Sequence, residues 1–414
     1  MSAPVPSAAA RCAVSPGETP AAALDLDGLL AAVRAVAGGG RQGGGGGRPV
    51  ALHEPWFGGR EREYVLDCID TGWVSSVGAY VDRFERAVAQ ACGVARAVAT
   101  VNGTAALHVA LLLAGVRPGD EVLIPTLTFV ATANAVSYCG ATPHFVDAEP
   151  ESLGMDPDRL EAHLAAIVVP GPGGGAVNRV TGRRLAAMAP MHVFGHPARI
   201  GRLAAVAARF GIALVEDAAE SLGSTQGGRP LGGRGLVGAV SFNGNKIVTT
   251  GGGGAVLTDD EGLADRAKHL TTTAKLPHRW AFDHDAVGFN YRLPNINAAL
   301  GCAQLERLDE FVALKRTLAA RYAAALAGVA GARFLAEPPD CRSNYWLNAV
   351  LLDDPADRDR ALAALNDAGF AARPCWTPMH RLPMYAGCPR DGLAVAEDIA
   401  ARLVNLPSSP ALAA

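Results

Sequence analysis

The segment SFNGNK, residues 241–246, runs directly into IVTTGGGGAVLTD, residues 247–259. The residues up to Asn243, GAVSFN, have the short apolar pattern of a buried strand, and AVLTD predicts a second strand after the glycines. The glycines allow two backbones to approach closely, because they carry no side chain. We therefore predict that Lys246 lies just past the end of one strand of a sheet.

An acidic residue holds a comparable place on another predicted strand, because IALVED ends at Asp217 within VEDAAES. A lysine in a dry site can lose its proton and form a Schiff base with an aldehyde, and a buried carboxylate keeps a pyridine nitrogen protonated. Either residue alone is more often a surface lysine or a helix cap. Together they predict a pyridoxal phosphate site, with Lys246 as the catalytic residue.

A third feature is the start of a helix at Asn102-Gly103-Thr104, which precedes AALHVALLLAG. Free N–H groups, the positive end of the helix dipole and a hydroxyl group meet there, as a phosphate requires. An ordinary Thr cap is the more common explanation, but the lysine and the aspartate on the same predicted sheet favour a phosphate site. Phe129, at the start of the next helix, can cover the cofactor ring, and Ser241 can add a hydroxyl to the phosphate.

The composition narrows the class of protein. The chain has 414 residues, of which 50% are hydrophobic, and its net charge of −3 gives no reason to expect nucleic acid or an anionic membrane as a partner. Its eight cysteines are scattered without a CxxC pair, which fits a reducing cytoplasm. No segment has the pattern of a signal peptide or a membrane span.

Two motif-like patterns are rejected. The HxxxH spacing of His192 and His196 contains Gly195 and is followed by Pro197, which argue against a helix that would place both rings on one face. We predict no metal site. GRGLVG, residues 233–238, has the GxGxxG spacing but precedes a strand instead of joining a strand to a helix, so it is interpreted as a loop.

Helix and strand patterns alternate from about Val50 onwards. The strand segments are almost continuously apolar, which is typical of parallel sheets covered by helices on both faces. Residues 50–305 therefore predict a large three-layer α/β/α domain with a mostly parallel sheet, and residues 306–414 a smaller C-terminal α+β domain. Residues 1–49 are interpreted as a disordered start, a small arm helix and a glycine-rich tether.

Several long segments resemble the DegT/StrS family of nucleotide-sugar aminotransferases, from about Val50 to Pro410. They include VNGTAALHVAL, PTLTFVATANAV, VEDAAESLGS, SFNGNKIVTTGGGGA and GFNYRLPNINAALGCAQLE. With LHEPWFGGREREYVLDCIDTGWVSSVGAYVDRFE, the chain looks closest to the LegC-like subgroup, associated with amination of 4-keto-6-deoxy-N-acetylhexosamines. The resemblance implies the fold type I architecture of pyridoxal phosphate enzymes and a homodimer with active sites at the interface.

The same resemblance implies roles for individual residues around the cofactor. Lys246 forms the Schiff base and Asp217 pairs with the pyridine nitrogen. The other implied cofactor contacts are Gly103, Thr104 and Ser241 at the phosphate, Phe129 on the ring, and Asn290 reaching the phosphate from the neighbouring subunit.

Substrate contacts are implied less directly. The candidates are Trp73, Arg292, Arg373 and His380. Glu220 departs from the family pattern, because many relatives have Gln or His there, and it faces cofactor or substrate with a different charge.

The implied reaction has two stages, in which L-glutamate gives its nitrogen to the cofactor and the ketone of a nucleotide-linked sugar then accepts it. Lys246 moves the proton between substrate and cofactor carbons. We expect UDP as the carrier ahead of GDP. The alternatives are a 3-ketosugar aminotransferase, a sugar dehydratase of the same fold and a non-catalytic regulator. Related dehydratases replace the lysine with histidine, so Lys246 argues against a dehydratase.

Overall fold

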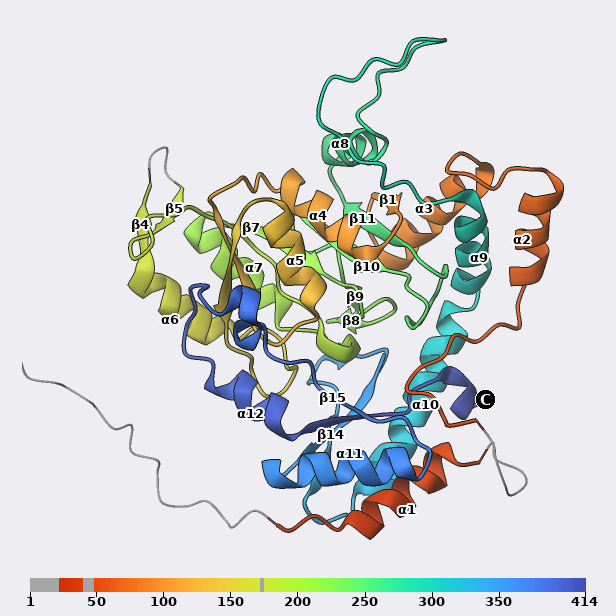
Figure 1. Cartoon of the computed structure of the whole chain (residues 1–414), viewed down its shortest axis with the longest axis vertical. Helices are drawn as coiled ribbons and strands as arrows, with labels where there is room; N and C mark the ends of the chain where they lie inside the picture. Colours follow the sequence, from red (N-terminus) through yellow and green to blue (C-terminus); the bar gives the residue numbers. More distant parts are fainter. Residues whose placement is uncertain (1–21, 40–47, 172–174) are drawn as a thin grey trace, which may run out of the picture.

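The centre of the molecule is a seven-stranded sheet in a computed structural model that describes residues 22–39, 48–171 and 175–414 (Figure 1). Strand β11 is antiparallel to both of its neighbours, and the other paired strands run parallel. The predicted mostly parallel sheet is therefore confirmed. In spatial order the strands are β1 (Arg96–Thr100), β11 (Gly254–Thr258), β10 (Val237–Ser241), β7 (Ala213–Asp217), β6 (Leu185–Met188), β2 (Glu121–Pro125) and β3 (Thr142–Val146).

Helices cover both faces of this sheet, because successive strand residues point to opposite sides and both sides are apolar. In β1, Val98 packs with the core on one face, whereas Ala97 and Ala99 pack with the core on the other. The first face is covered by α4 (Gly103–Leu113), α5 (Val130–Tyr138) and α8 (Glu261–Thr271). The second is covered by α3 (Ala79–Cys92), α9 (Asn295–Leu305), α6 (Pro157–Ile167) and α7 (Ile200–Phe210). This is the predicted three-layer arrangement.

The C-terminal part forms a second, smaller sheet with its own helices (Figure 1). A break at Glu306 and Arg307 separates α9 from α10 (Leu308–Leu326), which leads into this part. Its antiparallel strands, in spatial order, are β12 (Ala332–Phe334), β14 (Asn348–Leu352), β16 (Leu403–Leu406) and β15 (Arg373–Pro374). Its other helices are α11 (Arg358–Asp367) and α12 (Ala394–Arg402).

The first described helix, α1 (Leu26–Ala37), differs from the predicted arm. Its side chains Leu29 and Val33 are fully buried in one core with Leu318 and Tyr322 of α10. Each such aliphatic side chain contributes roughly 1.5–3 kcal/mol when buried. Helix α1 therefore belongs to the C-terminal core, beside α10 and α11 in Figure 1. The predicted disordered start and most of the glycine-rich tether lie outside the described residues.

Shorter elements complete the described chain. They are α2 (Glu61–Asp70), β4 (Val168–Pro170), β5 (Ala176–Asn178), β8 (Thr225–Gln226), β9 (Arg229–Pro230), β13 (Cys341–Arg342) and the 3-10 turns at Val193–Gly195, Pro355–Asp357, Met379–Arg381, Pro383–Tyr385 and Pro410–Leu412. Of residues 233–238, which were interpreted as a loop, 233–236 form a loop, and Val237 and Gly238 begin β10. In the described part of the chain, we find no helix with the length and apolar character to cross a bilayer.

Candidate active site

A cavity of about 330 Å³ lies where β7 and β10 end. In open α/β sheets the carboxyl ends of strands are the usual place for a ligand, and this volume is within the range of small-molecule sites. Residues predicted from distant parts of the sequence meet in its wall. Those that line it are Gly103, Thr104, Phe129, Asp217, Glu220, Ser241 and Lys246.

One end of this cavity is the first turn of α4. The side chain of Asn102 accepts a hydrogen bond from the Ala105 N–H at 2.8 Å, so Asn102 is the cap and Thr104 is left within the first turn. First-turn N–H groups have no acceptor within a helix. A Cβ on Gly103 would lie 2.8 Å from the Ser241 Cβ, so only glycine lets α4 and the end of β10 approach this closely.

The glycine tract after Lys246 serves the same close approach. A Cβ on Gly254, at the start of β11, would lie 2.5 Å from the carbonyl oxygen of Asn102. Glycine at this position therefore lets β11 pass directly beside the start of α4. The predicted close packing of backbones at the glycines is thus found between β11 and the start of α4.

The opposite end holds a buried carboxylate. Asp217 is 2% exposed, and its Oδ2 accepts a hydrogen bond from Thr132 Oγ1 at 2.7 Å, while its Oδ1 accepts one from the Ala219 N–H at 3.1 Å. Burial raises the pKa of the Asp217 carboxyl, although both hydrogen bonds and nearby Lys246 oppose that shift. A protonated pyridine nitrogen beside it would supply the positive charge that this buried anion favours.

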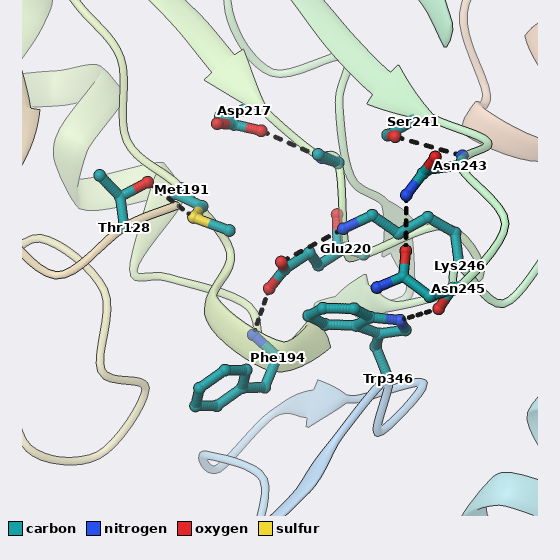
Figure 2. Close-up of polar contacts among 12 residues, drawn as sticks. Thr128, Met191, Phe194, Asp217, Glu220, Ser241, Asn243, Asn245, Lys246 and Trp346 are labelled. Atoms are coloured by element: carbon teal, nitrogen blue, oxygen red, sulfur yellow. Dashed lines mark hydrogen bonds and ion pairs between the residues drawn. The ribbon is translucent and has the colours of Figure 1, made fainter. Parts of the chain in front are cut away.

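Lys246 lies in the turn after β10, with its side chain 12% exposed (Figure 2). Its Nζ is 3.2 Å from Glu220 Oε1 and 4.0 Å from the centre of the Trp346 ring. The other oxygen of Glu220 accepts a hydrogen bond from the Phe194 N–H at 2.9 Å. Burial raises the pKa of the Glu220 carboxyl to about 7, with Lys246 acting in the opposite direction.

These features fit pyridoxal phosphate. The start of α4 offers unpaired N–H groups for the phosphate, Asp217 offers a buried anion for the ring nitrogen, and Lys246 offers an amine between them. Phe129 lines the same cavity and is 50% exposed, which leaves its ring face available for stacking.

Several lining residues were missed by the sequence analysis. Trp346 and Trp376 come from the C-terminal part of the chain, and no local pattern distinguishes them from core aromatics. Thr132 could have been found, because it lies one helical turn after Phe129 and so points to the same side of α5. The remaining lining residues are Asn102, Leu107, Ala131, Met191, Ala219, Asn243 and Asn245.

Three other predicted residues lie together elsewhere. Trp73 and Arg292 line a second cavity of about 820 Å³, formed by α2, the start of α3 and the segment after α8. Asn290 is exposed and accepts hydrogen bonds from the Arg292 guanidinium at 2.9 and 3.1 Å. Within one protomer, therefore, these residues do not line the cavity that contains Lys246.

The last two predicted substrate residues have local partners instead. His380 Nδ1 is 2.8 Å from Thr126 Oγ1 and its Nε2 is 2.9 Å from Glu397 Oε1, which holds the ring in a buried position. Arg373 donates to Asn366 Oδ1 and to the Ala372 carbonyl oxygen. Neither lines the cavity with Lys246. Their assignment as substrate contacts stays a prediction.

Comparison with known proteins gives a consistent set of relatives. Residues 57–414 match the model of the DegT/DnrJ/EryC1/StrS aminotransferase family. The chain is 39% identical over 368 residues to a GDP-perosamine synthase from Caulobacter vibrioides (strain ATCC 19089 / CIP 103742 / CB 15), covering 88% of this chain and 94% of that protein. It is 36% identical over 363 residues to a GDP-perosamine synthase from Escherichia coli O157:H7, again covering 88% and 94%. The crystal structure of the aminotransferase TlmJ from Streptoalloteichus hindustanus matches with a TM-score of 0.79, 31% identity and coverage of 88% and 94%.

Proposed function

The chain belongs to the DegT/DnrJ/EryC1/StrS aminotransferase family, and from this premise we propose that it transfers an amino group from L-glutamate to C4 of a GDP-linked 4-keto-6-deoxy sugar. It is a pyridoxal-phosphate-dependent sugar aminotransferase. The observation that carries the proposal is the meeting of Lys246, Asp217 and the start of α4 in one cavity. The LegC-like assignment and the N-acetyl group of the sugar stay predictions.

The choice of GDP departs from the sequence-based preference for UDP. Two relatives that cover most of this chain are named GDP-perosamine synthases, and this supports a guanosine carrier for the enzyme. The 4-keto-6-deoxy part of the proposal is supported by the resemblance of TGWVSSVGAYVDRFE, residues 71–85. The carrier and the sugar can be tested separately, because the nucleotide and the ketosugar offer different chemical groups to the enzyme.

Several residues of the cavity then have a role in the reaction. The cofactor, when bound, supplies the electron sink that makes transfer of the amino group possible. Asp217 holds a proton on the ring nitrogen by its negative charge, and the start of α4 binds the phosphate. Lys246 takes a proton from the donor carbon and returns one to the acceptor carbon. Trp346 and Trp376 help to exclude water from the ring side of the cavity.

A panel of nucleotide ketosugars tests the proposal. With L-glutamate as donor, we expect kcat/KM to be highest for the GDP-linked 4-keto-6-deoxy sugar, measured by formation of 2-oxoglutarate. The free ketosugar should lose kcat as well as affinity, because the remote nucleotide helps to place the keto carbon. A higher kcat/KM for the UDP-linked 4-keto-6-deoxy-N-acetyl sugar would reverse the carrier, and preference for a 3-ketosugar would overturn the site of amination. Product formed without consumption of glutamate would indicate the dehydratase.

We also propose a homodimer with shared active sites. Among the described lining residues of the cavity, Lys246 is the one with a cationic side chain, so a diphosphate needs further cations from outside it. Residues 272–294, between α8 and α9, extend from the body of the protomer at the top of Figure 1. Trp280, Phe282 and Val287 in this segment are 73%, 77% and 87% exposed, which favours an interface with a second copy.

Mixed dimers test the shared site. Asn290→Ala and Lys246→Ala proteins are each expected to be poorly active, because one lacks the contact from the partner and the other lacks the amine. After subunit exchange, each heterodimer should contain one site with both residues intact and so regain activity. The measurement is 2-oxoglutarate formation against the fraction of heterodimer, determined by native mass spectrometry. No recovery in confirmed heterodimers would contradict the contribution of Asn290 across the interface.

A further inference from the structure

The ammonium group of Lys246 is held from two sides. Glu220 Oε1 lies 3.2 Å from Nζ, and the face of the Trp346 ring lies 4.0 Å from it, so an anion and an aromatic face share one cation (Figure 2). Both partners are buried, at 3% and 5% exposure. Such contacts strengthen when water is excluded. The sequence did not predict that Glu220 or Trp346 contacts Lys246.

The carboxylate of Glu220 is fixed in place by the backbone. Its Oε2 accepts the hydrogen bond from the Phe194 N–H at 2.9 Å, which leaves Oε1 for Lys246. Phe194 has φ of 54°, a left-handed conformation that is uncommon for a residue with a side chain. Such backbone persists where surrounding structure enforces it, and it gathers at functional sites. Glu220 is therefore oriented before any ligand binds.

Trp346 is fixed just as firmly, and through three different groups. Its indole Nε1 donates to the Asn245 carbonyl oxygen at 2.7 Å, next to Lys246 itself. Its backbone N–H donates to Asn344 Oδ1 at 2.7 Å, and its carbonyl oxygen accepts a hydrogen bond from the fully buried Lys315 Nζ at 3.1 Å. The ring is thus tied both to the turn that carries Lys246 and to α10.

The other titratable groups near Lys246 and Glu220 are one carboxylate and two neutral side chains. Asp217 on β7 adds negative charge near Glu220, and burial raises the pKa of the Cys375 thiol to about 12, so that thiol is neutral. Burial, with Lys315 and Lys246 nearby, lowers the pKa of the His53 imidazole well below its usual value, so it is neutral too. At neutral pH, therefore, the negative charges near Nζ come from the carboxylates of Glu220 and Asp217.

We propose that Glu220 and Trp346 are positioning residues for Lys246, in which the Glu220 carboxylate favours the ammonium form of Nζ and the Trp346 ring keeps Nζ against that carboxylate. The two contacts hold the Lys246 side chain in one position inside the dry cavity, where loss of its proton gives the amine that attacks an aldehyde. This inference deepens the proposed function, because it concerns the amine of the same site.

The test measures when Lys246 becomes reactive as the pH rises. The full chain, freed of cofactor, is trace-labelled with acetic anhydride at a series of pH values, and the Lys246 peptide is quantified by mass spectrometry, with Lys268 as the internal reference. The labelling midpoint is the pH at which labelling of Lys246 is half-complete. We expect Glu220→Gln to lower this midpoint by about one pH unit or more, because the ammonium group loses its counter-ion. Glu220→Asp, which keeps the charge, should restore most of the shift.

Trp346 is tested in the same assay. Trp346→Leu removes the aromatic face and should also lower the midpoint, whereas Trp346→Phe keeps a face and should lie closer to the parent protein. Glu61→Gln is the matched control, because Glu61 is also buried but bonds to Gln304 away from the cavity. It should leave the Lys246 midpoint unchanged.

Two results would overturn the proposal. An unchanged Lys246 midpoint in Glu220→Gln, in protein whose circular dichroism and thermal unfolding match the parent, excludes the role of the Glu220 charge. An unchanged midpoint in Trp346→Leu under the same conditions excludes the role of the ring. The labelling uses neither cofactor nor sugar, so a protein that fails as an aminotransferase but shows these shifts refutes the proposed function and not this inference.

Discussion

Replacing Lys246 with alanine is expected to remove aminotransferase activity, with kcat lower by roughly 10²–10⁴-fold or more, because one side chain is both the attachment point and the proton carrier. Lys246 is the one lysine that lines the cavity, among the residues the structure describes, so no other amine can replace it there. Formation of 2-oxoglutarate measures the loss. The visible absorbance of the cofactor bound through the lysine should be lost in the same protein.

Chemical trapping makes the assignment specific. Borohydride reduction of the loaded parent protein should add the mass of the reduced cofactor to the peptide that contains Lys246, and Lys246→Ala should lack that adduct. Lys268→Ala is the control, since Lys268 pairs with Glu85 on the surface and is 42% exposed. Parent-like turnover in Lys246→Ala, or an adduct on another lysine, would refute the assignment.

The cofactor end of the site could be predicted because its residues follow strand ends. Asp217 and Ser241 end β7 and β10, which are parallel neighbours, so both residues lie at one edge of the sheet. Gly103 and Thr104 start the helix that packs on β10, and the glycines after Lys246 mark the close approach. In each case a short local pattern identifies the residue, and the regular geometry of a parallel sheet places it at the same edge as the others.

The position of Trp346 in the cavity and the position of helix α1 depend on packing between distant segments, which a local pattern does not encode. Trp346 reaches Lys246 because Lys315 and Asn344 hold its backbone, and nothing in NYWLNAV distinguishes it from a core tryptophan. Helix α1 shows the same limit. Its apolar stripe is visible in the sequence, but a stripe does not say which surface it covers, and the structure places it on α10.

The substrate side was the least predictable from the sequence. Arg373 and His380 were predicted without a position relative to the cofactor, and each has a local hydrogen-bonding partner outside the cavity that Lys246 lines. Arginine and histidine serve structure as often as binding, so their identity carries little information without a position. Asn290, Arg292 and Trp73 lie in or beside a segment that extends away from the protomer, where a role depends on contacts between copies.

Replacing Asp217 with asparagine should have the second-largest effect, because it removes the charge at the ring nitrogen while keeping the size of the side chain. A charged hydrogen bond in a buried site is worth about 1.5–3 kcal/mol, so cofactor affinity should fall roughly 10- to 150-fold. The loss in kcat should be larger, since a ring without its proton is a poorer electron sink. Fluorescence titration measures the affinity, and 2-oxoglutarate formation measures kcat.

A graded series separates the charge of Asp217 from its orientation. Thr132→Val removes the hydrogen bond to Oδ2 at 2.7 Å but leaves the carboxylate and most of the side-chain volume. Because this hydrogen bond only orients the carboxylate, the variant should lose about 0.5–1.5 kcal/mol, or roughly 2- to 13-fold, in cofactor affinity. Because the charge does the chemical work, kcat should fall far more in Asp217→Asn than in Thr132→Val. Equal losses in the two variants would mean that Asp217 acts by shape and hydrogen bonding, and that some other group holds the proton on the ring.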